Sequence, residues 1–344
     1  MDKTLVGRGT SQQKWSVEYD YLKGRGYTLR PRYHPKWTLP PGDPDIGRED
    51  RILQINPYCL DAARADGTQV YIKKVVKEKH PTEAEIAQFL SSSSLLSNSH
   101  NHTVPVIDSF AHSTEPEVLY LVMPLLRPFD EPSFTTIKES IDFVDQTLQG
   151  LAFMHEHNIA HRDCSAQNIM MDARDLYPNG WHPLAPRLTR DGKYWVTPQK
   201  NRSDANIRYF FIDFGLSTRF APGEPHFVVG AKGAAPAPEL SREIPYNPFK
   251  LDVYLLGKVF QEHICEAYVN VPFLELLVKD MTAFNPHDRP TAKDALKRWQ
   301  DICQSNQASS TRGWLHKKDE SVPERIVHDI ASSAMYAYTR LTSA

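Results

Sequence analysis

Three polar side chains that together could support phosphoryl transfer lie in two short stretches of the chain. Residues 161–168 read His-Arg-Asp-Cys-Ser-Ala-Gln-Asn, and residues 213–215 read Asp-Phe-Gly. Asp163 offers a carboxylate that can accept a proton from a hydroxyl, and Asn168 offers an amide oxygen suited to a hard divalent cation. Asp213 offers a carboxylate that could hold such a cation against phosphate groups. These residue types predict a site for transfer of a phosphoryl group.

One helix and two strands are expected to carry these stretches. Between residues 135 and 157 apolar side chains recur every three or four positions, which predicts a helix with one buried face. The apolar run 169–171 follows the first stretch, and the apolar run 209–212 precedes the second, so both indicate short strands. The buried helix face would lie beneath the loop that contains Asp163.

The two stretches belong to a longer series of motifs. Ahead of them the sequence predicts strands at 52–55 and 58–65, followed by a turn at Asp66-Gly67-Thr68. A Val-x-Ile-Lys strand, residues 70–73, comes next. Three motifs follow them: Ala237-Pro238-Glu239, the run from Asp252 to Gly257, and Asp288-Arg289-Pro290. In this order the sequence resembles the protein kinases. Its segments 123–129, 168–172 and 245–249 look like those of divergent kinase-like proteins of fungi.

The resemblance implies an α+β fold of two lobes, with a small β-rich lobe that carries one main helix and a larger, mainly helical lobe. A chain of 344 residues is long enough for two such units. The predicted parts are an N-terminal extension (1–50), a small lobe (51–126), a large lobe (127–303) with an insertion at 173–207, and a C-terminal tail (304–344).

The resemblance assigns the groups that would act on phosphate. Lys73 would contact the α- and β-phosphates of ATP and would pair with Glu85 on the small-lobe helix. Lys74 and Glu83 are the alternatives for these two positions. Asp163 would orient or deprotonate the substrate hydroxyl, while Asn168 and Asp213 would hold magnesium.

The resemblance also predicts which residues border ATP. Met123 would be the gatekeeper at the end of an apolar strand, and Pro124 would offer only its carbonyl towards the adenine, so its missing amide costs nothing. Leu126 keeps the amide that the adenine ring needs. Met170 and Ile212 complete the predicted ATP-binding residues.

Further residues match structural positions of the family. By resemblance, His161 would pack under Phe214, and Asp252 would brace the catalytic loop. Glu239 and Arg289 would form an ion pair in the large lobe.

The segment between the second stretch and the Ala-Pro-Glu motif, residues 213–239, would be the activation segment. Ser217 and Thr218 lie near its start, but its second half, residues 228–238, has no hydroxyl side chain. The usual phosphorylation switch is therefore not predicted. Arg162 could still pair with a phosphate added upstream.

The sequence departs from the family pattern at several positions. Asn56-Pro57-Tyr58 stands where the family has a glycine-rich loop over the phosphates, and Tyr71 is bulky where the family has alanine. Ser165 replaces the lysine of serine/threonine kinases, and Gln167 replaces the arginine of many tyrosine kinases. Neither of these phosphate-stabilising cations is present in the loop.

We therefore predict an ATP- and Mg²⁺-dependent protein kinase that acts on serine or threonine of a protein substrate, with Ser/Thr favoured by base rates. The alternative, motivated by the departures above, is a pseudokinase that serves as a scaffold. A small-molecule phosphotransferase is less favoured, because the chain keeps the Ala-Pro-Glu motif together with Asp252 and Arg289.

Composition restricts partners and compartment. The net charge is −2, with 40 Lys and Arg against 42 Asp and Glu, so no basic excess favours nucleic acid or an anionic membrane. The four cysteines are scattered without metal-site or disulfide-scaffold spacing. With no apolar run of roughly 20 residues and no signal-like start, we expect an intracellular protein, cytoplasmic or nuclear.

The outer segments give weaker predictions. The extension is rich in Pro, Gly, Arg and Tyr, which predicts a solvated linker with Trp15, Tyr19 and Tyr21 as possible anchors. The insertion is predicted to pack its aromatic residues over the surface or, alternatively, to form a partner-binding flap. In the tail, residues 326–330 have helical spacing.

Overall fold

The computed structural model describes residues 10–38, 49, 52, 54, 56–233, 235–305 and 313–321. The chain divides into two units. Within the described residues the first unit contains those up to Ser92, Val104–Arg127 and Asp172–Asn201, and the second contains the rest. The junction after Arg127 adjoins the predicted boundary between the lobes. No helix in the described part of the chain is both long and apolar enough to cross a membrane.

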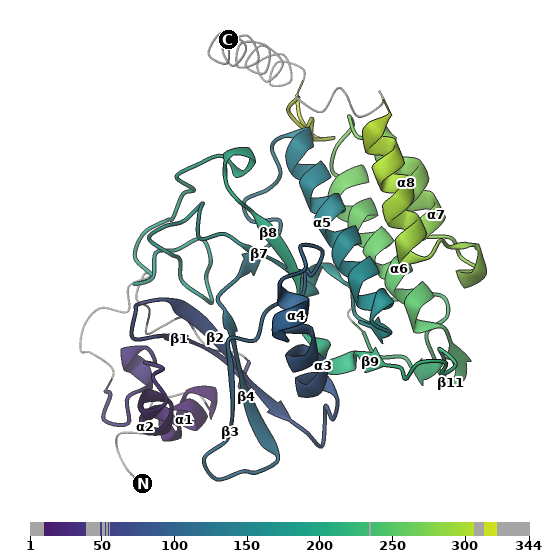
Figure 1. Ribbon diagram of the computed structural model, residues 1–344. Helices are drawn as coiled ribbons and strands as arrows, with labels where there is room; N and C mark the ends of the chain where they lie inside the picture. The colour runs from purple at the N-terminus through teal and green to yellow at the C-terminus, as the bar shows by residue number, and fades with distance from the viewer. Residues whose placement is uncertain are drawn as a thin grey trace. The chain divides into compact units, whose positions relative to one another are not determined.

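A four-stranded antiparallel sheet forms the centre of the first unit. Its order is β1 (Cys59–Ala63), β2 (Gln69–Val76), β4 (Val118–Pro124) and β3 (Asp108–Ala111), as Figure 1 shows. The predicted turn joins β1 to β2, because Asp66 accepts a hydrogen bond from the Thr68 amide at 2.9 Å and Gly67 has a φ of 83°. The main helix of this unit is α3 (Glu83–Leu90).

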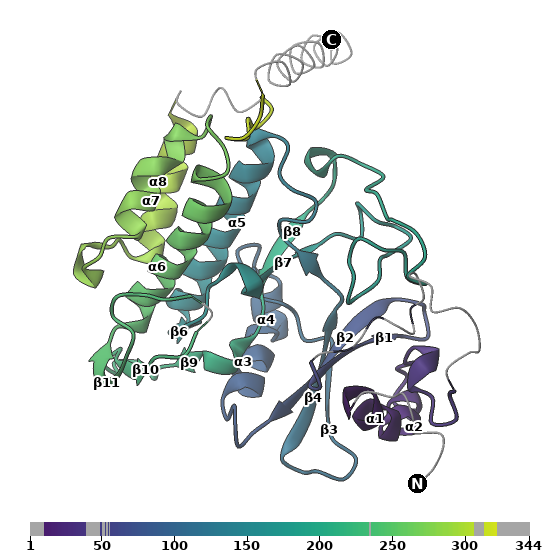
Figure 2. The same cartoon turned by 180° about the vertical axis from the view of Figure 1, so that it is seen from behind.

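The N-terminal extension is part of the core of the first unit. It contains α1 (Thr10–Val17), α2 (Tyr19–Gly24) and the short helix η2 (Pro31–Tyr33), and Figures 1 and 2 show α1 and α2 against the sheet. Its buried residues join those of the sheet in one cluster: Trp15, Tyr19, Leu22, Tyr27, Leu29, Tyr33, Leu60, Ala62, Val70, Ile72, Phe110, Tyr120 and Val122. The prediction of a mostly solvated linker was wrong here, because the outer face of the sheet is apolar and needs a cover.

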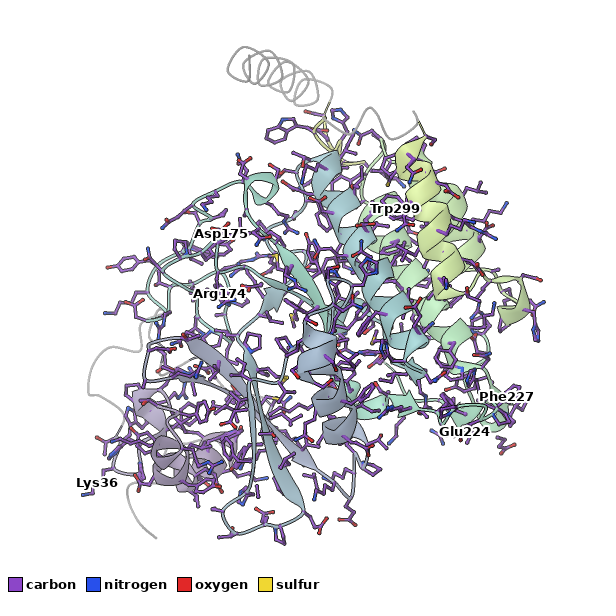
Figure 3. All side chains as sticks on the ribbon, viewed as in Figure 1. Lys36, Arg174, Asp175, Glu224, Phe227 and Trp299 are labelled. Carbon is purple, nitrogen blue, oxygen red and sulfur yellow. The ribbon has the colours of Figure 1, made fainter. Side chains whose placement is uncertain are left out.

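The insertion also packs within the first unit. Arg127 is buried, with its guanidinium 4.4 Å from the ring centre of Tyr177 and 5.7 Å from that of Trp181. Lys200 and Asp175 pair across the insertion with an N–O distance of 2.5 Å. Asp175 and its neighbour Arg174 are labelled in Figure 3. The prediction that aromatic residues pack here is confirmed for Tyr177 and Trp181, but it was wrong for Tyr194 and Trp195, which are 69% and 74% exposed.

Helices dominate the second unit: α4 (Ser93–Leu96), α5 (Ile137–Glu156), α6 (Pro248–Phe260), the π-helical turn η7 (Gln261–Cys265), α7 (Pro272–Met281) and α8 (Ala292–Gln304). The predicted helix is α5, which begins after a Thr136–Glu139 capping box. Leu148, Leu151 and Met154 lie on its buried face. Phe143 extends that face and stacks on Phe129 at a centroid distance of 4.5 Å.

The second unit also contains short strands, which flank its loops. They are β6 (Ile159–Ala160), β7 (Ile169–Asp172), β8 (Arg208–Phe211), β9 (Thr218–Arg219), β10 (Val228–Gly230) and β11 (Ser241–Tyr246), and β5 (Arg127–Pro128) pairs beside β7. Strand β6 pairs with β9, β7 with β8, and β10 with β11. Single helical turns are η4 (Ala166–Asn168), η5 (Arg202–Asp204), η6 (Phe214–Leu216) and η8 (Pro286–Asp288).

The described part of the tail packs on the start of α5. The Leu315 amide donates to the Thr135 carbonyl at 2.8 Å, and Leu315 is buried. The predicted helical stretch 326–330 lies outside the described residues.

Candidate active site

A buried carboxylate fixes the loop that contains Asp163. Asp252, in the first turns of α6, is fully buried and accepts hydrogen bonds from the amides of His161, at 2.7 Å, and Arg162, at 2.6 Å. His155 contacts the same carboxylate at 3.0 Å. Arg162 has a φ of 67°, a left-handed conformation that an arginine adopts only when its surroundings hold it. The predicted bracing role of Asp252 agrees with this geometry.

His161 connects this loop to the segment that carries Asp213. Its Nδ1 accepts from the Asp163 amide at 3.2 Å, so its Nε2 is the donor to the Ile212 carbonyl at 3.0 Å. The ring lies 5.4 Å from that of Phe214, which is also buried. His161 therefore packs against Phe214 as predicted, and its hydrogen bonds use both ring nitrogens.

The three polar residues of the predicted transfer site are brought together in the second unit. The side-chain Nδ2 of Asn168 donates to the Asp163 carboxylate at 2.9 Å and to the Asp163 carbonyl at 3.0 Å. The Ile212 amide donates to the Asn168 carbonyl at 3.0 Å, so Asp213 is the residue that directly follows this backbone pairing. The neutral side-chain amide of Asn168 therefore orients the Asp163 carboxylate.

The side-chain oxygen atoms of Asn168 and Asp213 are suitable ligands for magnesium. Because the Asn168 nitrogen bonds to Asp163, its amide oxygen is the group left for a cation. The Asp213 side chain is exposed; one of its oxygens accepts from the Gly215 amide at 3.1 Å, and its backbone φ is 63°. An amide oxygen and a carboxylate are among the oxygen ligands that Mg²⁺ prefers.

In the first unit, Lys73 pairs with Glu83 and not with the predicted Glu85. Glu83 is buried at the start of α3, together with Ile86 and Leu90, which lie three and seven residues further on. Positions at this spacing share one helix face, whereas Glu85 falls on the exposed face. The assignment of Glu85 was wrong, and the alternative Glu83 is the residue that the structure supports.

The alternation of side chains along β2 decides between the two lysines. Lys74 points to the face that the N-terminal extension covers, with its ammonium 4.4 Å from the Trp15 ring centre, and burial lowers the pKa of Lys74. Lys73 lies on the opposite face of the sheet. The structure therefore favours Lys73 over Lys74 for the predicted role, and its contact with phosphate stays a prediction.

The predicted ATP-binding residues fall on both units. Met123 and Pro124 end β4, where Met123 lies opposite Tyr71 of β2, and Leu126 follows. These residues belong to the first unit. Met170 of β7 and Ile212 after β8 are half-buried residues of the second unit. Their contact with a nucleotide stays a prediction.

The edge of β1 has no glycine-rich strand beside it among the described residues. Thr28 of the extension bridges to Ala63, with backbone amide-to-carbonyl distances of 2.8 and 2.9 Å, and the Gln54 side-chain Nε2 donates to the Cys59 carbonyl at 2.5 Å. The predicted strand 52–55 lies partly outside the described residues. Sequence reasoning missed the role of Thr28, because no local pattern signals a single bridging residue.

Neutral oxygen atoms surround the Arg162 guanidinium. It donates to the carbonyls of Leu216, at 3.1 Å, and Val229, at 3.2 Å. Its other acceptors are the hydroxyls of Thr218, at 3.3 Å, and Tyr246, at 3.4 Å. Tyr246 lies in the segment 245–249, but its contact with Arg162 was not predicted, because that contact depends on the pairing of β10 with β11.

The predicted ion pair of Glu239 and Arg289 is present. It is bidentate, with N–O distances of 2.5 and 3.0 Å, and the Arg289 side chain is fully buried. Arg289 also donates to the carbonyls of Ala283, at 2.7 Å, and Lys250, at 2.9 Å. These contacts tie the Ala-Pro-Glu motif to the segments before and after α7.

The sequence is similar to known protein kinases. Residues 59–275 match the family model of the protein kinase domain. The chain is 26% identical over 69% of its length to the serine/threonine-protein kinase shk1/pak1 of Schizosaccharomyces pombe, and covers 35% of that protein. It is 24% identical over 60% of its length to calcium/calmodulin-dependent protein kinase type 1 of Caenorhabditis elegans, and covers 51% of it.

A third relative belongs to another class: protein-tyrosine kinase 6 of Mus musculus is 27% identical over 34% of this chain, which covers 29% of that protein. The chain thus spans about half or less of the length of these relatives. The family model covers more than half of the chain. With its motifs in family order on an α+β fold, the chain belongs to the protein kinase family.

Proposed function

We propose that this protein is an active kinase that transfers the γ-phosphoryl group of ATP to a hydroxyl of a protein substrate. The observation that carries the proposal is the geometry of Asp163. Its carboxylate accepts a hydrogen bond from Asn168 at 2.9 Å, in a loop whose backbone is held by the buried Asp252. A scaffold protein has no chemical need for a carboxylate held in this way.

The residues of the chain divide the reaction between them. Asp163 accepts the proton of the substrate hydroxyl as the new bond forms, and Asn168 keeps its carboxylate oriented. Lys73, held by Glu83, would contact the α- and β-phosphates. Asn168 and Asp213 would hold magnesium, which when bound offsets the negative charge of the phosphates.

We infer serine or threonine as the acceptor. Two relatives whose names state serine/threonine specificity align with 69% and 41% of this chain, whereas the tyrosine kinase aligns with 34%. The chain also lacks an arginine at Gln167, where many tyrosine kinases carry one. Phosphoamino acid analysis of the product would identify the acceptor, and phosphotyrosine alone would contradict this inference.

The decisive experiment compares wild type with Asp163→Asn in a magnesium-dependent transfer assay over a broad protein and peptide panel. Loss of the general base should lower the transfer rate about 10²- to 10⁴-fold while ATP binding changes little. Asp213→Asn should weaken magnesium-dependent ATP binding as well. Equal, background-level transfer by wild type and Asp163→Asn would reject the enzyme and favour a scaffold.

The scaffold alternative has one structural observation in its favour. The edge of β1 is occupied by Thr28 and the Gln54 side chain, where the family has a strand that leads into the phosphate-covering loop. Loss of the loop that covers the phosphates affects binding of the nucleotide more than the chemical step. We therefore expect weak ATP affinity but measurable turnover.

A further inference from the structure

The catalytic loop of the second unit offers no cation of its own to the transferring phosphoryl group. The residues between Asp163 and Asn168 are Cys164, Ser165, Ala166 and Gln167. Ser165 is buried, and its hydroxyl forms no hydrogen bond with the described residues. Arg162 is engaged by neutral oxygen atoms of the activation segment and of Tyr246. Negative charge on the transferring oxygen atoms needs a donor from elsewhere.

The activation segment approaches Asp163 at Gly233. A Cβ atom at this position would lie 3.6 Å from a carboxylate oxygen of Asp163 and 3.8 Å from the Arg162 carbonyl. Gly233 has a φ of 152°, which favours glycine over residues with a side chain. The backbone of the segment therefore lies directly against the catalytic carboxylate, and glycine permits this approach.

Lys232 immediately precedes this contact. It is exposed and, among the described residues, it forms no hydrogen bond or ion pair. The remaining residues from Ala231 to Pro238 are alanine, glycine or proline, so Lys232 is the one charged side chain in that stretch of the sequence. Adjacent Cα atoms are about 3.8 Å apart, and a lysine carries its ammonium on a flexible four-carbon stem. The ammonium can therefore reach a phosphate bound at Asp163.

We propose that Lys232 is a catalytic residue that supplies the phosphate-stabilising cation missing at Ser165. The proposal rests on the kinase activity proposed above. The acceptor oxygen forms a bond to the γ-phosphorus, and the bond from that phosphorus to the β–γ bridging oxygen breaks. ADP leaves with the electron pair of the broken bond, and the acceptor proton passes to Asp163. Lys232 keeps its proton and stabilises charge on the transferring oxygen atoms.

The test measures kcat and the KM for ATP of wild type, Lys232→Ala and Lys232→Arg with magnesium, ATP and the best substrate of the panel. Arg242→Ala is the matched control, because Arg242 is an exposed cation on β11 of the same unit. Lys232→Ala should lower kcat about 10²- to 10³-fold, as for loss of one transition-state donor, with the KM for ATP changed less than about threefold. Lys232→Arg should recover at least about a tenth of the wild-type rate.

The outcomes separate this inference from the proposed function. If wild type transfers phosphate and Lys232→Ala matches both wild type and Arg242→Ala, Lys232 has no catalytic role, while the kinase proposal stands. A rise in KM with kcat unchanged would likewise overturn the transition-state role. If wild type does not exceed Asp163→Asn, the kinase proposal fails, and the role of Lys232 fails with it.

Discussion

Lys73 of β2 forms its ion pair with Glu83, the first residue of α3, and not with Glu85 two positions later. A charged hydrogen bond of this kind contributes about 1.5 to 3 kcal/mol, so its loss should lower kcat/KM for ATP about 10- to 100-fold. We expect Glu83→Gln to show this loss. Glu85→Gln is the matched control and should retain nearly the activity of wild type, because Glu85 is exposed. Equal losses in the two variants would contradict the pairing.

The Glu239–Arg289 pair should be a major source of stability. Arg289→Ala leaves the largely buried Glu239 carboxylate without its partner, which should lower the free energy of unfolding by about 3 to 5 kcal/mol. Arg298→Ala breaks an exposed pair with Asp280, 2.8 Å in the structure, and should cost about 1 kcal/mol or less. Urea denaturation monitored by tryptophan fluorescence measures both changes. An unmoved midpoint for Arg289→Ala would show that the pair is dispensable.

The activity should not depend on phosphorylation of the activation segment. Arg162 is already bonded to the carbonyls of Leu216 and Val229, and Ser217 is buried with its hydroxyl donating to the His161 carbonyl at 3.1 Å. We expect a Ser217→Ala, Thr218→Ala double variant to keep transfer within about thirtyfold of wild type, since it loses two hydrogen bonds worth about 1 kcal/mol each and a tenfold change in rate is about 1.4 kcal/mol.

Phosphatase treatment of the purified kinase, followed by the same transfer assay, checks this independence. The rate should be unchanged. A large loss of rate that returns on rephosphorylation of residues 217–218 would show that a phosphate replaces the neutral acceptors of Arg162.

The N-terminal extension should contribute directly to the stability of the first unit. Trp15 is buried against Tyr120, at a ring distance of 6.3 Å, so Trp15→Ala should cost about 3 to 5 kcal/mol. Val17 of the same helix is 82% exposed, and Val17→Ala should stay within about 0.5 kcal/mol of wild type. If both variants unfolded at the wild-type denaturant concentration, the extension would not belong to the folded core in solution.

Local patterns were sufficient for much of the fold and of the site. The apolar spacing from 135 to 157 predicted α5, because a buried helix face must repeat every three to four residues. Asp66-Gly67-Thr68 predicted the turn between β1 and β2, because only a few residue types suit such a turn. The order of the motifs predicted the loop braced by Asp252 and the pairing of Glu239 with Arg289.

Local patterns did not determine which of two neighbouring side chains forms a given contact. Contacts between distant segments of the chain determined this. Glu83 and Glu85 are equivalent as carboxylates, and only the packing of α3 determined which one faces Lys73. Lys73 and Lys74 alternate across one strand, and burial of Lys74 against Trp15 identified the face that the extension covers. The sequence by itself thus determined which chemical groups this protein has and in what order. Their partners followed from the tertiary structure, because burial selects among side chains that local spacing treats alike.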